Sequence, residues 1–176
     1  MLPIKTERLV LRALSMADAS AIAEGIGSFD VIKWLAVPPY PYAVADAEAF
    51  LERRTAIPNS ADATAGLILD GRLRGICSIE RREGGPMLGY WLAQSAWGHG
   101  LITEAARALL TQFFNHGDAD WVLSGYFTGN AASARVLEKL GFQAVGDGVM
   151  FNRPQGRDLP HVDVVLTRER FQALSS

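Results

Sequence analysis

The spacing of apolar residues predicts the longest helix of the chain over residues 102–114. Apolar side chains recur there at steps of three and four, so one face of the helix is apolar and the other is polar. The residues of the apolar face are Ile102, Ala105, Ala106, Leu109, Leu110, Phe113 and Phe114. Asn115, His116 and Gly117 follow and predict the end of the helix.

Three further helices are predicted from their flanking residues. Asn130 is a suitable N-cap and Gly141 a natural C-terminal stop for one of them. Asp18 and Asp46 stand near the starts of the other two. These helices are expected at Met16–Ile26, Ala43–Ile57 and Ala131–Leu140.

Short apolar runs between the helices predict the strands of a sheet. Asp70-Gly71 is a signal for a two-residue hairpin between two of these runs. The strands are expected at Leu9–Leu14, Ala63–Leu69, Leu73–Glu80, Met87–Leu92, Trp121–Phe127, Phe142–Met150 and Val162–Leu166. Helices follow only the first, fourth and fifth of them, which predicts a mixed α/β sheet and not a regular βαβ repeat.

The candidate site is a turn with two glycines, Gly98 and Gly100, between a predicted strand and the longest helix. This order places unpaired main-chain N–H groups at a helix N-terminus, where the helix dipole also favours an anion. Glycine lets the main chain approach a phosphate closely. Taken alone, such a pair more often marks only a tight turn before a helix.

Two common phosphate-binding motifs can be compared with this turn. A P-loop ends in Gly-Lys-Ser/Thr, and no lysine lies between Lys33 and Lys139. A dinucleotide fingerprint has a third glycine where this chain has Thr103, although Asp118 and Asp120 lie at the distance of its ribose-binding acid. The sequence therefore disfavours a dinucleotide site without excluding it.

The turn and its flanks carry a family resemblance. The segments Gly89–Leu92, Trp97–Gly100 and Thr103–Ala105 resemble the acetyl-CoA signature of the GNAT acetyltransferases, and more narrowly of their RimJ/RimL-like branch. Similar segments follow in the same order over nearly the whole chain: Thr6–Arg12, Pro38–Pro41, Asp46–Leu51, Asn130–Ser133, Glu138–Phe142, Pro160-His161 and Val164–Glu169.

The resemblance implies a fold. It is a single GNAT-type domain over residues 1–176, with a mixed, mostly antiparallel sheet of about seven strands and about four helices. Two parallel strands, Met87–Leu92 and Trp121–Phe127, would splay apart and hold the cofactor between them. A crevice at the carboxyl ends of diverging parallel strands is a physically reasonable ligand site.

The resemblance also implies acetyl-CoA as co-substrate and no metal. The main chain of Trp91 and Leu92 would pair with the pantetheine arm, and Asn130 and Ser133 would contact that arm near the thioester. The diphosphate would be held by Trp97, Gly98, His99, Gly100, Leu101, Ile102 and Thr103. Ser95 departs from the wider superfamily, which often has Gln or Arg there, so one long polar contact to the cofactor would be lost.

Acetyl transfer from a thioester to an amine sets the catalytic requirements. The amine must be neutral, an oxyanion must be stabilised, and the leaving thiolate needs a proton or a hydrogen bond. Glu80 is the candidate base, or else a solvated acid, and Ser133 is the candidate donor to the sulfur. Tyr126 is the alternative donor, or else a packing residue. His161 could line the acceptor pocket.

Composition narrows the class of protein only a little. The chain has 176 residues, 49% hydrophobic and 20% charged, as in ordinary soluble domains. A net charge of −2 gives no reason to expect nucleic acid or a membrane as partner. The single cysteine, Cys77, fits a reducing cytoplasm, and no segment has the pattern of a secretion signal or membrane span.

We therefore expect a cytoplasmic N-acetyltransferase that acts by direct attack of a primary amine within a ternary complex. The acceptor could be a protein N-terminus. The alternatives are a small-molecule amine, such as an amino acid, polyamine or aminoglycoside, and a non-catalytic CoA-binding module. The sequence leaves open whether the chain is a monomer or a homodimer.

Overall fold

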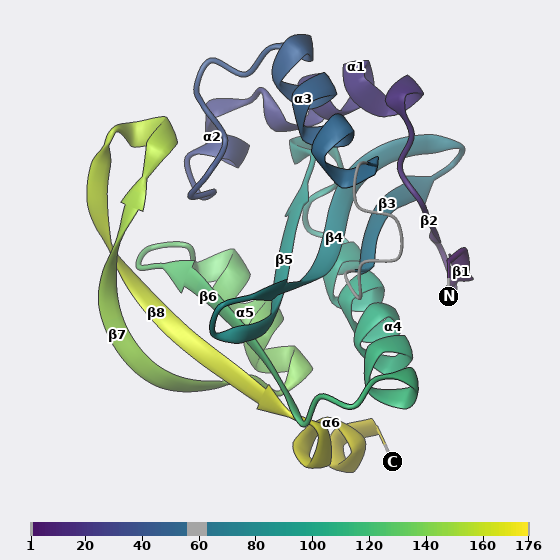
Figure 1. The fold of residues 1–176 in the computed structure, drawn as a ribbon, viewed down its shortest axis with the longest axis vertical. Coiled ribbons are helices and arrows are strands. Elements are labelled where there is room, and N and C mark those ends of the chain that lie inside the picture. Colours follow the sequence, from purple (N-terminus) through teal and green to yellow (C-terminus); the bar gives the residue numbers. More distant parts are fainter. Residues whose placement is uncertain (1, 56–62, 176) are drawn as a thin grey trace.

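A computed structural model describes residues 2–55 and 63–175. Within these residues, one eight-stranded sheet runs in the order β1-β2-β3-β4-β5-β6-β8-β7 (Figure 1). The strands are β1 (Ile4–Lys5), β2 (Val10–Arg12), β3 (Ala63–Leu69), β4 (Arg72–Arg82), β5 (Gly85–Leu92), β6 (Trp121–Phe127), β7 (Gln143–Asn152) and β8 (Arg157–Thr167). Neighbouring strands are antiparallel, except that β5 and β6 are parallel.

Six α-helices lie within the described residues and cover both faces of the sheet (Figure 1). They are α1 (Ala19–Ile26), α2 (Phe29–Ile32), α3 (Val44–Thr55), α4 (Leu101–His116), α5 (Ala131–Leu140) and α6 (Arg168–Ser175). Short 3₁₀ turns stand at Met16–Asp18, Gln94–Ala96 and Arg153–Gln155. None of the described helices is both long and apolar enough to cross a membrane.

The predicted fold class is confirmed, and several elements are added to it. The strand β1 and the helix α2 are too short to produce a periodic pattern. The helix α6 is strongly polar, so its sequence shows little of an apolar face. The β7–β8 hairpin is longer than predicted, mainly because β8 begins at Arg157 and not at Val162; its first four residues are mostly exposed and show no apolar run.

The first two predicted elements have shorter bounds than expected. The predicted strand Leu9–Leu14 forms pairs only at Val10–Arg12. The predicted helix Met16–Ile26 begins with a 3₁₀ turn, where the Asp18 carboxylate accepts hydrogen bonds from the Ser15 N–H and from Arg12. The predicted helix Ala43–Ile57 is observed as α3, and its last two residues lie outside the described residues.

Alternate residues of the central strands pack into two separate cores. Cys77 and Ile79 of β4 face the main core, which contains the apolar side of α4 and part of α5. Ile76, which precedes them, packs with α1 and α3 on the opposite face. Since successive side chains of a strand point to opposite faces, this division assigns each residue of the central strands to one side of the sheet.

Candidate active site

The central feature of the site is the divergence of β5 and β6. Only one pair, Met87 with Leu123, is in register between these strands, whereas β4 pairs with β5 along all of β5. The strands separate after this pair toward their carboxyl ends (Figure 1). Main-chain groups along the separated part must find side chains, water or a ligand as partners.

Two carbonyl groups of β5 are bound by side chains at the gap. The Ser124 hydroxyl donates to the Leu88 carbonyl oxygen at 3.0 Å, and the Trp97 indole Nε1 donates to the Leu92 carbonyl oxygen at 2.8 Å. Tyr90 lies between these two positions. Trp97 therefore ties the glycine turn to the end of β5, although its ring is partly exposed.

The hydrogen-bond alternation of β5 distinguishes Trp91 from Leu92. The Ala93 N–H donates to the Arg74 carbonyl oxygen of the neighbouring segment at 2.7 Å. In an antiparallel pair such bonds recur at every second residue, so the main chain of Trp91 faces β4. That of Tyr90 and Leu92 faces the gap. The pantetheine contact predicted at Trp91 and Leu92 stays a prediction, and Leu92 is the one of the two whose main chain faces the gap.

The two glycines at the start of α4 adopt the conformation that glycine favours. Gly98 has a φ of +82° and Gly100, the N-cap of α4, a φ of +72°. Leu101 and Ile102 bury their side chains in the main core. Only main-chain groups of those two residues are therefore available to a ligand at the turn, as expected for diphosphate binding through N–H groups.

A polar pair spans from β5 to α5 near the gap. The Tyr90 phenol lies 2.8 Å from the Ser133 Oγ, and either atom can be the donor. Burial raises the pKa of the Tyr90 phenol above its ordinary value, so the phenol remains protonated at neutral pH. Tyr90 has no role among the residues predicted from the sequence. The sequence feature that could have indicated this contact is a tyrosine in a buried strand, because a buried phenol needs a polar partner.

Asn130 is confirmed as the N-cap of α5. Its Oδ1 accepts a hydrogen bond from the Ser133 N–H at 3.2 Å, which satisfies one of the free donors of the first turn. Gly141 follows the last residue of α5 with a φ of +96°, as expected for a C-terminal stop. The structure therefore brings Asn130, Ser133 and Tyr90 together.

Glu80 lies on the other face of the sheet, in an ion pair. Its Oε1 accepts hydrogen bonds from the Arg54 guanidinium at 2.5 Å and from the Ser78 hydroxyl at 2.9 Å. Burial acts to raise the pKa of the Glu80 carboxyl, but Arg54 and Ser78 outweigh it and hold that pKa below its ordinary value. Glu80 is a weak base in this state, and it shares its face of the sheet with Ile76, opposite Tyr90.

The remaining candidates occupy packed positions. Tyr126 is partly buried against the main core. His161 is buried, its ring packs nearly perpendicular to that of Phe127, and its Nδ1 lies 3.1 Å from an Asp163 carboxylate oxygen. Burial raises the pKa of the Cys77 thiol to about 12, so it is a core residue and not a nucleophile. No cluster of metal-ligating side chains occurs within residues 2–55 and 63–175.

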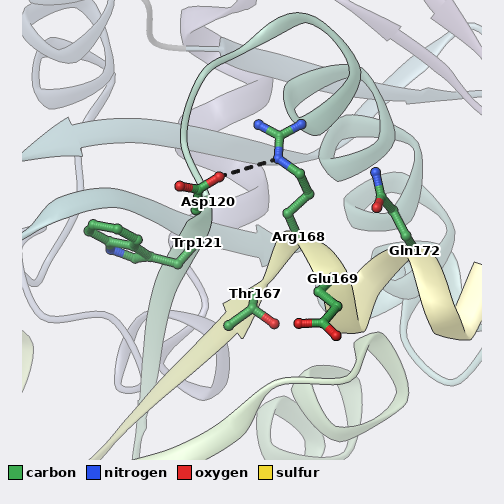
Figure 2. A pocket seen from close by; sticks show the side chains of 6 residues that line it. All are labelled: Asp120, Trp121, Thr167, Arg168, Glu169 and Gln172. Atoms are coloured by element: carbon green, nitrogen blue, oxygen red, sulfur yellow. Dashed lines mark ion pairs between the residues drawn. The ribbon is translucent and has the colours of Figure 1, made fainter.

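A shallow hollow lies at the opposite end of β6 from the site. It is lined by Asp120, Trp121, Thr167, Arg168, Glu169 and Gln172 (Figure 2). Arg168 donates to the main-chain carbonyl oxygens of Gly117 and Ala119 at 2.7 and 2.8 Å. The Arg168 side chain thus fixes the segment that follows α4. We therefore assign Arg168 a structural role and do not include this hollow in the candidate site.

The candidate site lies where two parallel strands of an α/β sheet diverge, with a glycine turn at a helix N-terminus on one side. A family model described as an acetyltransferase (GNAT) domain matches residues 8–143. The chain belongs to this family of acetyltransferases.

Individual relatives agree with this assignment. The chain is 32% identical over 161 residues to "Putative ribosomal N-acetyltransferase YdaF" of Bacillus subtilis (strain 168), covering 83% of this chain and 85% of the relative. The structure of Mycobacterium smegmatis RimJ in complex with CoA-disulfide is similar with a TM-score of 0.78 and 22% identity, covering 92% of this chain and 82% of RimJ. The structure of AAC(6')-Ib in complex with ribostamycin and coenzyme A is similar with a TM-score of 0.77 and 21% identity. The match covers 97% of this chain and 99% of AAC(6')-Ib.

Proposed function

We propose that this protein transfers the acetyl group of acetyl-CoA to a primary amine, by direct attack within a ternary complex. The observation that carries the proposal is the divergence of β5 and β6 after a single registered pair, beside the glycine turn that starts α4. Family membership supplies the acyl-transfer chemistry. Coenzyme A is present in the complexes of RimJ and AAC(6')-Ib.

The residues beside the diverging strands fit the chemistry of this co-substrate. The N–H groups that follow Gly98 and Gly100 would bind the diphosphate, and the main-chain N–H of Leu92, whose carbonyl oxygen accepts from Trp97, would face the pantetheine amides. When bound, acetyl-CoA supplies an activated acyl group and a thiolate leaving group. The protein itself has to orient the sulfur and the amine and to keep competing water away.

Ser133 is proposed as the donor to the leaving sulfur. If the protonated Tyr90 phenol donates to the Ser133 Oγ, the Ser133 hydroxyl hydrogen is free to point elsewhere. A hydroxyl held in this way can donate a hydrogen bond to a developing thiolate, which stabilises the transition state more than the ground state. Tyr126 is the weaker candidate because it packs against the main core.

The proposed acceptor is an α-amine, such as a protein N-terminus. An α-amino group with a pKa near 7.8 is about one quarter neutral at pH ~7.4, whereas a lysine with a pKa near 10.4 is only about one thousandth neutral. The lysine would cost roughly 4 kcal/mol to deprotonate. Since Arg54 lowers the pKa of Glu80, the site's candidate base is weak, which favours the acceptor that needs a base least.

Two observations about relatives are relevant to the acceptor. The name of YdaF refers to ribosomal N-acetylation, and AAC(6')-Ib is complexed with ribostamycin. A protein N-terminus is preferred because YdaF is the relative with the greater identity. A small-molecule amine is the second candidate, and a CoA-binding protein without turnover is the third. The chain's single cysteine, Cys77, supports a reducing cytoplasm as the site of the reaction.

Release of free thiol from acetyl-CoA tests the proposal. The assay is run without acceptor and with three matched sets: peptides with a free N-terminus, the same peptides with an acetylated N-terminus and an internal lysine, and aminoglycosides or polyamines. Turnover with the first set alone supports the proposed acceptor. Turnover only with the third set identifies a small-molecule acetyltransferase. Coenzyme A binding without turnover on any set contradicts the enzymatic function.

A further inference from the structure

A carboxylate stands in the first turn of the helix that is proposed to bind the diphosphate. Glu104 is four residues after Gly100, and its side chain is only 15% exposed. A negative charge at this place is stabilised by the helix dipole, but it also competes with and repels any anion bound at the same N-terminus. Without compensation, Glu104 would therefore weaken diphosphate binding.

The compensation comes from the other end of the sequence. Arg8 Nε donates to Glu104 Oε2 at 2.7 Å, and the Arg8 NH2 group lies 2.6 Å from the same oxygen. The main-chain N–H of Arg8 donates to Oε1 at 2.9 Å, and the Thr6 hydroxyl donates to it at 2.5 Å. Both carboxylate oxygens of Glu104 are thus bound by the segment that leads into β2.

Arg8 also contacts the glycine turn directly. Its NH1 group donates to the main-chain carbonyl oxygen of His99 at 2.8 Å. His99 lies between the two glycines, whose positive φ values make this turn easy to distort. One guanidinium therefore holds both the turn and the carboxylate of the first helical turn, in the forked geometry that arginine and not lysine provides.

The ionisation of Glu104 agrees with this arrangement. Burial acts to raise the pKa of the Glu104 carboxyl, but the hydrogen bonds from Thr6 and Arg8 and the charge of Arg8 lower it below its ordinary value. Glu104 is therefore an anion at neutral pH. The Arg8–Glu104 pair contributes no net charge beside the turn. The main-chain N–H groups at the start of α4 therefore make the main electrostatic contribution to diphosphate binding.

We propose that Arg8 is a positioning residue for the co-substrate: it neutralises Glu104 and fixes the His99 peptide, so that the turn presents its N–H groups to the diphosphate. This inference rests on the proposed use of acetyl-CoA. It assigns the segment Thr6–Leu9 to the co-substrate site, although that segment lies about ninety residues earlier in the chain than the turn.

Calorimetric titration with coenzyme A tests the charge argument. In Arg8→Gln, the negative charge of Glu104 is left uncompensated. The dissociation constant of coenzyme A is expected to rise about tenfold, because one partly screened negative charge then repels the doubly charged diphosphate. In the double variant Arg8→Gln/Glu104→Gln, the constant is expected to return to within about threefold of the parent value. Glu104→Gln alone is expected to bind at least as tightly as the parent.

A donor without a diphosphate separates positioning from general damage. With S-acetylpantetheine, kcat/KM of Arg8→Gln is expected to equal that of the parent, because the diphosphate-binding part of the site is not used. Arg12→Gln is the matched control. It removes an equivalent arginine–carboxylate pair, Arg12 with Asp18 at 2.7 Å, away from α4, and it should leave coenzyme A binding unchanged.

The outcomes are distinct. Unchanged coenzyme A affinity in Arg8→Gln overturns the inference, and so does a double variant that binds no better than Arg8→Gln. Equal losses with acetyl-CoA and S-acetylpantetheine also overturn it, since they indicate general damage to the site and not a lost diphosphate contact. If Arg8→Gln does not fold, the inference is overturned when Glu104→Gln alone binds coenzyme A more weakly than the parent. Failure of the proposed function itself is recognised separately, because the parent protein then binds no coenzyme A.

Discussion

The substitution Ser133→Ala separates a role in transition-state stabilisation from a role in binding. It removes the hydroxyl that lies 2.8 Å from the Tyr90 phenol, but it keeps the main-chain N–H that donates to Asn130 at 3.2 Å. The N-cap of α5 therefore survives. The protein should fold normally, with a loss of about 1 kcal/mol in the free energy of unfolding from one neutral hydrogen bond.

The expected effect on turnover is larger. A hydrogen bond to a charged group contributes about 1.5–3 kcal/mol. If Ser133 donates to the developing thiolate, its loss raises the barrier by that amount, and kcat falls by a factor of about 10 to 150. The dissociation constant of coenzyme A should change by no more than about threefold, because the contact gains most of its strength in the transition state.

The measurement combines thiol release at saturating acetyl-CoA with calorimetric titration of coenzyme A. Ser124→Ala is the control, since it also removes one serine hydroxyl beside the gap, the one that donates to the Leu88 carbonyl at 3.0 Å. This control should keep kcat near the parent value. An unchanged kcat in Ser133→Ala would exclude Ser133 from the mechanism, and a loss of coenzyme A affinity with kcat unchanged would make it only a binding residue.

Three further results are expected. A Cβ at Gly125 would lie 2.9 Å from the Val162 carbonyl oxygen, so Gly125→Ala should lower the free energy of unfolding by about 2 kcal/mol in urea; an unchanged midpoint contradicts the packing. The pKa of Glu80 is lower in the folded than in the unfolded chain, so its ion pair with Arg54 stabilises the protein above pH ~4.5 and is lost as the pH falls through the folded pKa. The parent should therefore be more stable than Glu80→Gln at pH 7 and lose this advantage as the pH falls below ~4.5, and an advantage independent of pH refutes the pairing. Asn130→Ala should cost about 1 kcal/mol and Asn130→Asp much less, which thermal unfolding can check.

Local patterns predicted the elements that interact mainly with themselves. The helix α4 follows from a sustained apolar period, and α5 from that period with its two caps. The hairpin at Asp70-Gly71 follows from turn chemistry, since both residues have the positive φ that such a turn requires. By contrast, the β7–β8 hairpin is longer than predicted, because an exposed strand is held by its partner's main chain and shows no alternation.

The parts of the candidate site that depend on local main-chain conformation could be predicted from the sequence. The contacts between side chains that lie far apart in the sequence could not. The sequence by itself determined the glycine turn, the start of α4 and the caps of α5, since each depends on the conformational preferences of a few adjacent residues. Only the tertiary structure decided that Tyr90 meets Ser133, that Arg54 neutralises Glu80, and that Arg8 reaches the turn. Such contacts depend on sheet order and on which face each residue occupies, and these are properties of the whole chain.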